Sequence, residues 1–338
     1  MFNLITDVPG LLVGHAHDAG LASGVTCVLF EAAATASMAI HGGAPGVRDT
    51  ALLEPDMTVD GVNALVLSGG SAFGLDSMGG VQGVLRARGI GFRIGSAVVP
   101  IVPGAVVFDL LNGGNKAWGR MPPYWELGAL AAEAAAPGAF PLGSVGAGLG
   151  ATTATLKGGL GSASVAVEGF TVGALVAVNA LGSATVGTGP HFWAAPAERN
   201  GEFGGLGLPH PMPPDAGAVP MKGVEPASTT IGIVATDAVL TKGQAKRLAV
   251  MAQDGLARAL RPTHATLDGD VVFAAATGRH PAPVDHRVLT LLGTAAADCL
   301  ARAIARGIYE ATALAGPGPL PAWRDRFGLQ NGAIDARP

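Results

Sequence analysis

Two threonines, Thr229 and Thr230, open the apolar segment 231–235, directly after a long stretch rich in glycine and proline. Such a flexible stretch leaves the start of a buried strand open to a cut in the chain. After a cut before Thr229, this residue would carry its own α-amine, and an α-amine with a pKa of about 7.7–8.0 is partly unprotonated near neutral pH. A hydroxyl beside such an amine is an activated nucleophile that needs no histidine. The pattern predicts a self-cleaving amide hydrolase with Thr229 as its nucleophile.

Serine and cysteine nucleophiles fit the sequence less well. The nearest Gly-x-Ser-x-Gly candidate, residues 69–73, has phenylalanine where the motif requires its second glycine. Cys27 and Cys299 lie in apolar runs, which predicts two buried free thiols. His15 and His17 indicate a structural or binding pair, because no Cys/His metal spacing surrounds them. We therefore expect neither a metal nor another cofactor.

Four further polar residues could assist the threonine. Lys157 is the single charge in residues 143–162; lysine usually reaches solvent, but a buried lysine would have a lowered pKa and could act in catalysis. Asn179 ends an apolar strand and either caps a turn or donates to an oxyanion. Asp268 and Asp270 flank one glycine and could orient the hydroxyl and hold Lys157 by ion pairing, although turns of this kind are common.

A glycine-rich turn at residues 68–74 follows the apolar segment 64–67 and leads into the helical pattern 75–88. A strand, a glycine turn and a helix N-terminus together can form an anion or oxyanion pocket, and Ser71 is our candidate for contacting the substrate there. No phosphate-loop motif matches the turn. A tight turn packed against a sheet explains the same pattern equally well.

The elements that must position these residues are short strands with few helices. The expected strands are 24–31, 36–41, 64–67, 162–167, 171–179, 229–235 and 271–276. The expected helices are 75–88, 125–136, 240–260 and 287–314. Residues 95–111 contain two prolines and indicate an irregular or edge segment, and residues 187–227 indicate a flexible loop, long enough to suggest processing or function. This order predicts an α+β fold and a single domain over residues 1–338.

Composition limits the possible partners. Apolar residues make up 49% of the 338 residues and charged residues only 14%, which favours a large core and a homotetramer or other homo-oligomer that hides surface. The net charge of −4 and the lack of a basic cluster argue against nucleic-acid binding. The first residues show no signal-peptide pattern, and no apolar run is expected to reach membrane-spanning length, so a cytoplasmic location is expected.

Taken together, the motifs resemble the P1 peptidase family, which includes L-aminopeptidase/D-esterases, β-aminopeptidases and 6-aminohexanoate-oligomer hydrolases. The resemblance runs from Thr6 to about Leu314. Its most specific matches are Ser228-Thr229-Thr230-Ile231 with residues 234–237, and Thr263-His264 with residues 267–274. A threonine with an Asp-x-Asp pair looks most like the nylon-oligomer-hydrolase branch, since the peptidase branch has serine and Ser-Gly-Glu there.

The resemblance implies an αββα sandwich of the N-terminal-nucleophile hydrolase kind. It implies self-cleavage into residues 1–228 and 229–338, two fragments that stay together and act on a small amide or peptide substrate. Thr229 falls on the position of the nucleophile, and Lys157, Asn179, Asp268 and Asp270 fall on the other active-site positions. Asn179 would donate to the tetrahedral oxyanion, while the lysine and the aspartates would set the protonation and orientation of the threonine.

Two positions depart from the family pattern. Ser228 stands where this branch usually has asparagine, so cleavage could be slower or could occur one bond earlier, with Ser228 as nucleophile. Phe108 stands where some relatives have a tyrosine near the substrate. Phenylalanine has no hydroxyl that could donate to an oxyanion or to the substrate, which argues against activity on nylon oligomers. An acyltransferase of the ornithine acetyltransferase type and a non-catalytic protein that keeps the fold stay open as alternatives.

Overall fold

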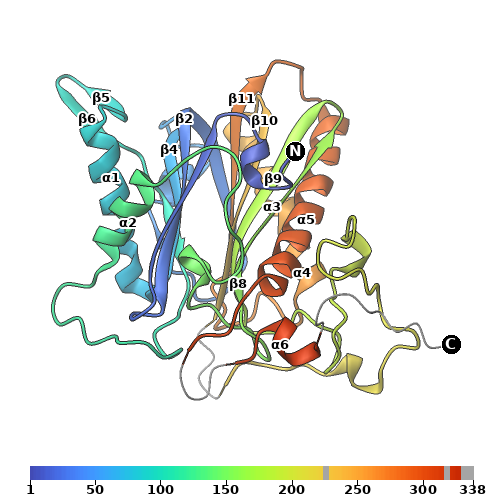
Figure 1. The fold of residues 1–338 in the computed structure, drawn as a ribbon. Coiled ribbons are helices and arrows are strands. Elements are labelled where there is room, and N and C mark those ends of the chain that lie inside the picture. The colour runs from blue at the N-terminus through green and yellow to red at the C-terminus, as the bar shows by residue number, and fades with distance from the viewer. Residues whose placement is uncertain (224–227, 316–319, 329–338) are drawn as a thin grey trace.

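Helices and sheets stack in the order helix, sheet, sheet, helix (Figure 1). This computed structural model describes residues 1–223, 228–315 and 320–328. Within them, nine strands form one hydrogen-bonded array that passes through the long strand β2 (Ser23–Ile40). The first part of β2 pairs with β4 and its last part pairs with β11, so that β2 belongs to both sheets. The expected αββα sandwich is confirmed.

The first sheet surrounds the N-terminal part of β2. Its other strands are β1 (Leu11–Asp18), β3 (Val47–Arg48), β4 (Val62–Ser68) and β7 (Gly104–Val106). Two helices cover its outer face, namely α1 (Ser77–Ala87) and α2 (Tyr124–Glu133). The small residues of α1 and α2 allow a close approach, because a Cβ on Gly80 would lie 1.9 Å from the carbonyl oxygen of Trp125.

The second sheet holds the predicted nucleophile. Its strands after β2 are, in spatial order, β11 (Val271–His280), β10 (Thr229–Ala238), β9 (Phe170–Asn179) and β8 (Gly159–Val167). Its outer face is covered by α3 (Lys242–Ala252), α4 (Asp254–Ala259) and α5 (His286–Tyr309). Along β10, Ile231 and Ile233 face the other sheet while Val234 faces the helices. Burial on both faces explains why this strand is a continuous apolar run.

Three sequence predictions of secondary structure need correction. The segments 24–31 and 36–41 are one strand, because β2 shifts register between Leu29 and Ala34 and continues. The helix expected at 240–260 divides into α3 and α4 at Gln253. The segment 95–111 contains part of an exposed hairpin, formed by β5 (Phe92–Ile94) and β6 (Ala97–Val99), followed by the buried β7.

The long connection before β10 is anchored rather than loose over its described part, 187–223. Phe192 and Phe203 are buried and pack edge to face, and Phe192 stacks on Trp323 of the short helix α6 (Trp323–Phe327). Glu202 forms an ion pair with the buried Arg302 of α5 at 2.5 Å. These contacts correct the expectation of a flexible linker, since two aromatic anchors and a buried ion pair fix the segment.

One helix bears on the membrane question. Among the described residues, α5 is long and apolar enough to cross a membrane by length and composition, contrary to the expectation from the sequence. However, 67% of its apolar window is buried inside the fold, against the second sheet. This is the burial of a core helix.

Candidate active site

Four strand ends of the second sheet meet at one edge, at the bottom of Figure 1. Strand β10 runs parallel to β11 and antiparallel to β9, and β9 runs antiparallel to β8. The starts of β8, β10 and β11 therefore lie at the same edge as the end of β9. This topology brings together residues that are far apart in the sequence, namely Lys157, Asn179, Thr229, Asp268 and Asp270.

The hydroxyl of Thr229 lies against the peptide bond that precedes it. Thr229 is 5% exposed, and its Oγ1 donates to the carbonyl oxygen of Ser228 at 2.5 Å. The N–H of Gly269 donates to the same carbonyl oxygen at 3.0 Å. A Cβ on Gly269 would lie 2.6 Å from Thr229 Oγ1, so only glycine fits beside the hydroxyl. The bond between residues 228 and 229 thus has a hydroxyl and a backbone donor at its carbonyl.

Asp270 is a buried carboxylate that accepts hydrogen bonds at both oxygens. Its Oδ1 accepts from the N–H of Thr230 at 2.8 Å, next to the predicted nucleophile. Its Oδ2 accepts from Thr263 Oγ1 at 2.8 Å and from His264 at 2.9 Å, through both the backbone N–H and Nδ1. Burial alone would raise the pKa of Asp270, but these donors outweigh it and the pKa is lowered. Asp270 is therefore ionised.

Asp268 has the opposite protonation. Burial, the negative charge of Asp270 and a hydrogen bond with that carboxylate raise the pKa of Asp268 to about 8. The backbone of Ser228 bridges to that of Asp268 across the strand starts, which places Asp268 next to the residue that precedes Thr229. The aspartate pair thus carries one proton near neutral pH, held on Asp268.

Asn179 pairs with Thr229 in the register of β9 and β10. Its Oδ1 accepts from the N–H of Thr152 at 3.0 Å, and its Nδ2 donates to the carbonyl oxygen of Phe108 at 2.9 Å. These two backbone partners fix the orientation of the amide, because reversing it would oppose donor to donor and acceptor to acceptor. An amide nitrogen carries two hydrogens, so one N–H of Asn179 remains for another acceptor.

Lys157 is buried, as one of the two interpretations of the sequence required. Burial and the nearby Lys222 ammonium lower its pKa to about 7. Its Nζ donates to the carbonyl oxygens of Gly148, Ala151 and Gly158 at 2.9, 2.7 and 2.8 Å. The expected ion pair with the aspartates does not form among the described residues, because three backbone carbonyls already accept all three N–H groups.

Lys222 is a residue of this edge that sequence reasoning missed. Its Nζ donates to Asn179 Oδ1 at 2.8 Å and to the carbonyl oxygen of Thr152 at 3.1 Å. Burial lowers the pKa of Lys222 to about 7, against the opposing charges of Asp268 and Asp109. In the sequence it is one charge in a long loop, and no local pattern links it to Asn179.

The glycine turn after β4 is held by a buried carboxylate. The N–H of Gly70 donates to Asp109 Oδ1 at 2.7 Å, and Ser23 Oγ donates to Asp109 Oδ2 at 2.6 Å. The N–H of Ser71 donates to the carbonyl oxygen of Val107 at 2.9 Å. These amides are already occupied, so the expected anion pocket is wrong at these two donors and the tight-turn alternative holds. Burial raises the pKa of Asp109.

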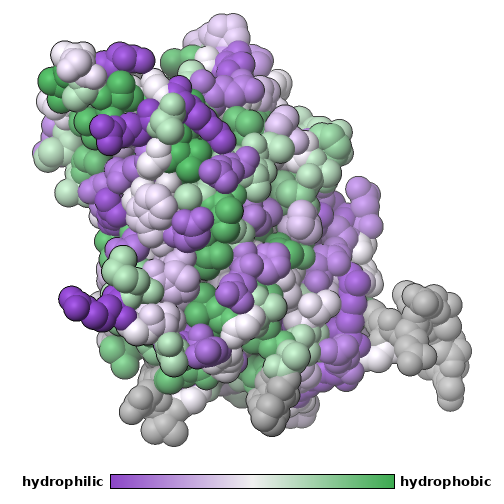
Figure 2. Space-filling model, turned by 60° about the vertical axis from the view of Figure 1, so that its left-hand side comes forward, coloured by the Kyte–Doolittle hydropathy of each residue, from purple (hydrophilic) through white to green (hydrophobic). Residues whose placement is uncertain are grey.

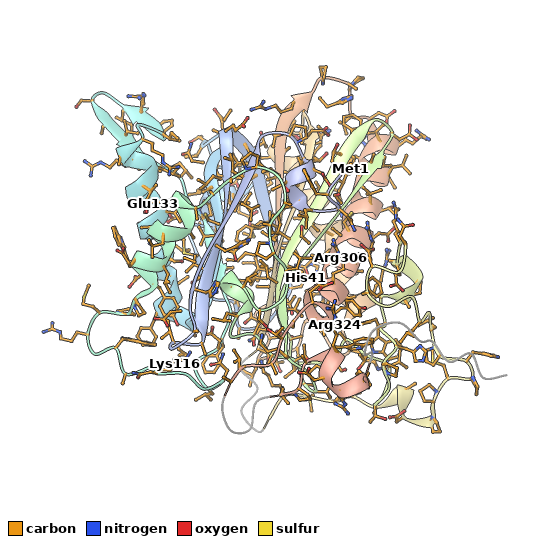
Figure 3. All side chains as sticks on the ribbon, viewed as in Figure 1. Met1, His41, Lys116, Glu133, Arg306 and Arg324 are labelled. Atoms are coloured by element: carbon orange, nitrogen blue, oxygen red, sulfur yellow. The ribbon has the colours of Figure 1, made fainter. Side chains whose placement is uncertain are left out.

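The two residues predicted to bind substrate lie close to each other in the chain fold. The N–H of Ser71 reaches Val107, next to Phe108, and Phe108 contacts Asn179 through its carbonyl oxygen. The Phe108 side chain is partly buried. Lys116, labelled at the lower left of Figure 3, follows on the same connection and donates to the carbonyl oxygen of Leu21.

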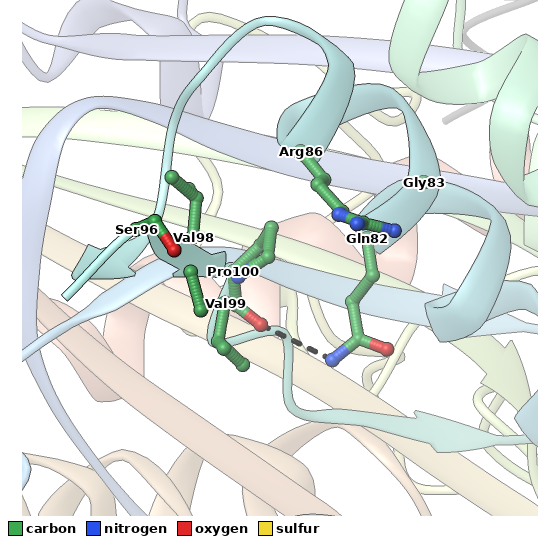
Figure 4. Close-up of a pocket in the computed structure, with 8 residues that line it drawn as sticks. Gln82, Gly83, Arg86, Ser96, Val98, Val99 and Pro100 are labelled. Carbon is green, nitrogen blue, oxygen red and sulfur yellow. Dashed lines mark hydrogen bonds between the residues drawn. The ribbon is translucent and has the colours of Figure 1, made fainter. Parts of the chain in front are cut away.

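Other reactive residue types do not form a second catalytic centre here. Burial raises the pKa of Cys27 and of Cys299 to about 12, which confirms two buried thiols. Within the described ranges, no group of three or more His, Cys, Asp or Glu side chains could hold a metal. A cavity of about 560 Å³ lies between α1 and the β5–β6 hairpin (Figure 4), where Gln82 Nε2 donates to the Pro100 carbonyl at 3.1 Å. It contains none of the predicted site residues.

The polar edge of the second sheet groups a threonine, an amide, two lysines and two carboxylates, and the comparisons with known proteins give this edge its class. The family model for Peptidase family S58 matches residues 3–319. The chain belongs to this family, and the resemblance to the P1 aminopeptidase group is confirmed.

Named relatives agree with this family. The chain is 41% identical to an uncharacterised aminopeptidase of Mycobacterium tuberculosis, over 96% of this chain and 98% of the relative. It is 27% identical to a 6-aminohexanoate-oligomer endohydrolase of Agromyces, over 80% and 74%.

Solved structures share the fold. A Burkholderia β-aminopeptidase matches with a TM-score of 0.70 at 24% identity, over 96% of this chain and 92% of that one. The L-aminopeptidase D-Ala-esterase/amidase of Ochrobactrum anthropi, titled a new variant of the Ntn hydrolase fold, matches with a TM-score of 0.65 at 22% identity, over 95% and 89%.

Proposed function

We propose that this hydrolase cuts its own chain between Ser228 and Thr229 and then uses Thr229 as its catalytic nucleophile. The observation that carries the proposal is the 2.5 Å contact between Thr229 Oγ1 and the carbonyl oxygen of Ser228. A hydroxyl so close to its own preceding carbonyl can reach the carbonyl carbon and form a five-membered ring. The Gly269 N–H on the same oxygen would stabilise the negative charge that develops there.

Self-cleavage would proceed in two steps. Oγ1 of Thr229 adds to the carbonyl carbon of Ser228, the C–N bond breaks, and the Thr229 nitrogen takes the hydroxyl proton, which leaves an ester. Water then hydrolyses the ester to give a carboxylate on Ser228 and a free amine and hydroxyl on Thr229. The neutral Asp268 beside this bond is a candidate proton donor.

In the cleaved enzyme, the α-amine of Thr229 would take the proton from its own hydroxyl as that hydroxyl attacks the substrate amide. The spare N–H of Asn179 would donate to the tetrahedral oxyanion, because Asn179 pairs with Thr229 across the sheet. To the extent that Lys157 and Lys222, each with a pKa of about 7, are charged, they would lower the pKa of the α-amine and favour its unprotonated form. Ion pairs with the aspartates are not needed for this effect.

We propose N-terminal residues of short peptides, or short non-standard amides, as substrates. The 41% identity to a protein named as an aminopeptidase supports the first class more than the 27% identity to an oligomer endohydrolase supports the second. Phe108 contacts Asn179 through its backbone carbonyl and lacks a tyrosine hydroxyl, which does not favour nylon oligomers.

Intact-mass analysis of the purified protein tests the proposal. Two fragments are expected, the shorter beginning at Thr229, and they should elute together because β10 lies in the middle of the second sheet. Thr229→Ala should stay one chain and be inactive, whereas Ser228→Ala should still be cut. A single mass near 33.5 kDa for the unchanged protein would refute self-cleavage, and a fragment beginning at residue 228 would move the nucleophile to Ser228.

We also propose a homo-oligomer. Large apolar side chains are exposed on the β5–β6 hairpin and near α2, and the upper left of Figure 2 shows apolar groups (green) where the hairpin projects. They include Phe92, Ile94, Leu111, Met121 and Trp125. Light scattering that gives the mass of one chain would refute this proposal.

A further inference from the structure

The hydrogen bonds of Asp270 concentrate on one residue outside the proposed machinery. Three donors converge on Oδ2, and two of them, the backbone N–H and Nδ1, belong to His264. The Asp270 side chain is 1% exposed, whereas that of His264 is 23% exposed. A partly exposed imidazole thus reaches into a buried carboxylate from the surface.

The backbone of His264 is held in an unfavourable conformation. Its φ is +55°, in the left-handed region that only a few per cent of non-glycine residues occupy, histidine more often than most. Residues held this way persist where the surrounding structure over-determines them, and they concentrate at functional sites. Here the conformation has a visible result, because the N–H and the ring of one residue point at the same oxygen.

A short chain of contacts joins His264 to the bond before Thr229. Asp270 holds the N–H of Thr230 through its other oxygen, at 2.8 Å. The neighbouring Asp268 bridges to Ser228, and Gly269 between them donates to the Ser228 carbonyl. A change in the charge of Asp270 would therefore act on both residues that flank the nucleophile.

We propose that His264 is a positioning residue for the nucleophile: its two hydrogen bonds keep Asp270 ionised, so that the proton of the aspartate pair stays on Asp268. The inference rests on the proposed function, since it assigns work to the same site. Without the ring, Asp270 would lose one of its four donors and would hold a proton more readily. If Asp270 took up the single proton of the pair, Asp268 would be ionised instead and could no longer donate a proton.

Other charged groups around the pair provide the controls. His41, labelled in Figure 3, packs edge-on against His264 with ring centroids 5.2 Å apart. Burial and the neighbouring His264 lower the pKa of His41, while Asp254, Asp270 and Lys246 also act on it. Its ring makes no hydrogen bond to the Asp270 carboxylate among the described residues, in contrast to His264. Lys222 acts on Asp268 from the other side.

The first experiment compares pH profiles of kcat. In His264→Gly, glycine accepts the positive φ and the backbone N–H remains, so the ring donor is lost. The acid limb should move up by about one pH unit, the scale of one charge-assisted hydrogen bond. Thr263→Val should move it in the same direction by less. His41→Asn should leave the limb in place, and His264→Asn, whose side-chain amide can donate from the position of Nδ1, should bring the limb most of the way back.

A second readout does not depend on activity. In uncut Thr229→Ala protein labelled with ¹³C at aspartate carboxyls, the Asp270 signal is assigned through Asp270→Asn and titrated. The midpoint for Asp270 should rise by about one unit with His264→Gly and stay unchanged with His41→Asn. Equal midpoints in all three proteins overturn the inference, as does a lower kcat with an unmoved acid limb.

The two experiments separate the two claims. If the unchanged protein is never cut and shows no activity, the proposed function fails, while the titration still decides the role of His264. If the protein is cut and active but the Asp270 midpoint ignores His264, only the inference about His264 fails.

Discussion

Two buried carboxylates, Asp109 in the first sheet's turn region and Asp270 at the start of β11, behave in opposite ways. Asp109 is 2% exposed and Asp270 0%, so burial does not separate them. Asp109 accepts from two donors, Ser23 Oγ and Gly70 N–H, and its pKa is raised. Asp270 accepts from four donors, and its pKa is lowered. At similar burial, the carboxylate with more donors has the lower pKa.

The largest contrast should come from replacing each carboxylate by its amide. Asp270→Asn should lower the free energy of unfolding by about 3 kcal/mol and stop cleavage, because two backbone N–H groups cannot turn away from the new NH₂ group. Asp109→Asn should lower it by only about 1 kcal/mol, because the Ser23 hydroxyl can turn and accept. Urea unfolding in a Thr229→Ala background measures both, and equal losses would break the comparison.

Gly70, beside Asp109, should matter for stability, whereas Gly269, beside Asp270, should matter for self-cleavage. Gly70 has φ +84°, and a Cβ there would lie 2.1 Å from the Tyr124 ring, so Gly70→Ala should cost about 3 kcal/mol of stability. A Cβ on Gly269 would lie 2.6 Å from Thr229 Oγ1. Gly269→Ala should therefore mainly slow self-cleavage, by about tenfold or more, because it displaces the attacking hydroxyl. The Tm and the time course of fragment appearance test the pair; Gly269→Ala cut at the normal rate contradicts the proposed geometry.

The pH dependence of stability should have opposite slopes for the two variants. Asp270 has a folded pKa below its unfolded value of about 3.9, so its contribution is present above that pH and is lost as the pH falls. Asp109 has a folded pKa above that value, so ionisation destabilises the fold increasingly as the pH rises. Unfolding free energies of each variant against its parent test this, below about pH 4 for Asp270 and above about pH 4 for Asp109. Parallel slopes would show that one of the two directions is wrong.

The smallest effect is expected at Lys222. Thr152 and Phe108 orient the Asn179 amide without it, so Lys222→Met should remove only the charged donor on Oδ1. We expect kcat to fall by about three- to tenfold, with cleavage still complete. Lys246→Met, which breaks a surface ion pair with Glu54, is the matched control and should leave kcat unchanged. A larger loss of kcat in Lys222→Met than in Asp270→Asn would contradict the expected order of effects.

Part of the site could be predicted from the sequence because its residue types are rare in their surroundings. Lys157 and Asn179 interrupt apolar or neutral segments, and Thr229 opens a buried strand after a long loop. The sequence predicts the start of the strand at Thr229 and the end of the strand at Asn179 correctly, whereas the strand after Lys157 begins at Gly159 rather than at 162. The sequence could not decide between a pocket and a tight turn at the glycine turn, because the carboxylate that accepts from Gly70, Asp109, lies 39 residues further along the chain.

The sequence by itself determined the family, the strand that carries Thr229 and the aspartate pair two residues apart. Tertiary structure decided which of the two aspartates holds the proton, because that depends on Thr263 and His264 reaching Oδ2 of Asp270. It also decided that Lys157 is held by carbonyls and that Lys222 reaches Asn179 from 43 residues away. Residue types follow from the chain, but protonation follows from donors and charges that only the folded sheets bring within hydrogen-bonding distance.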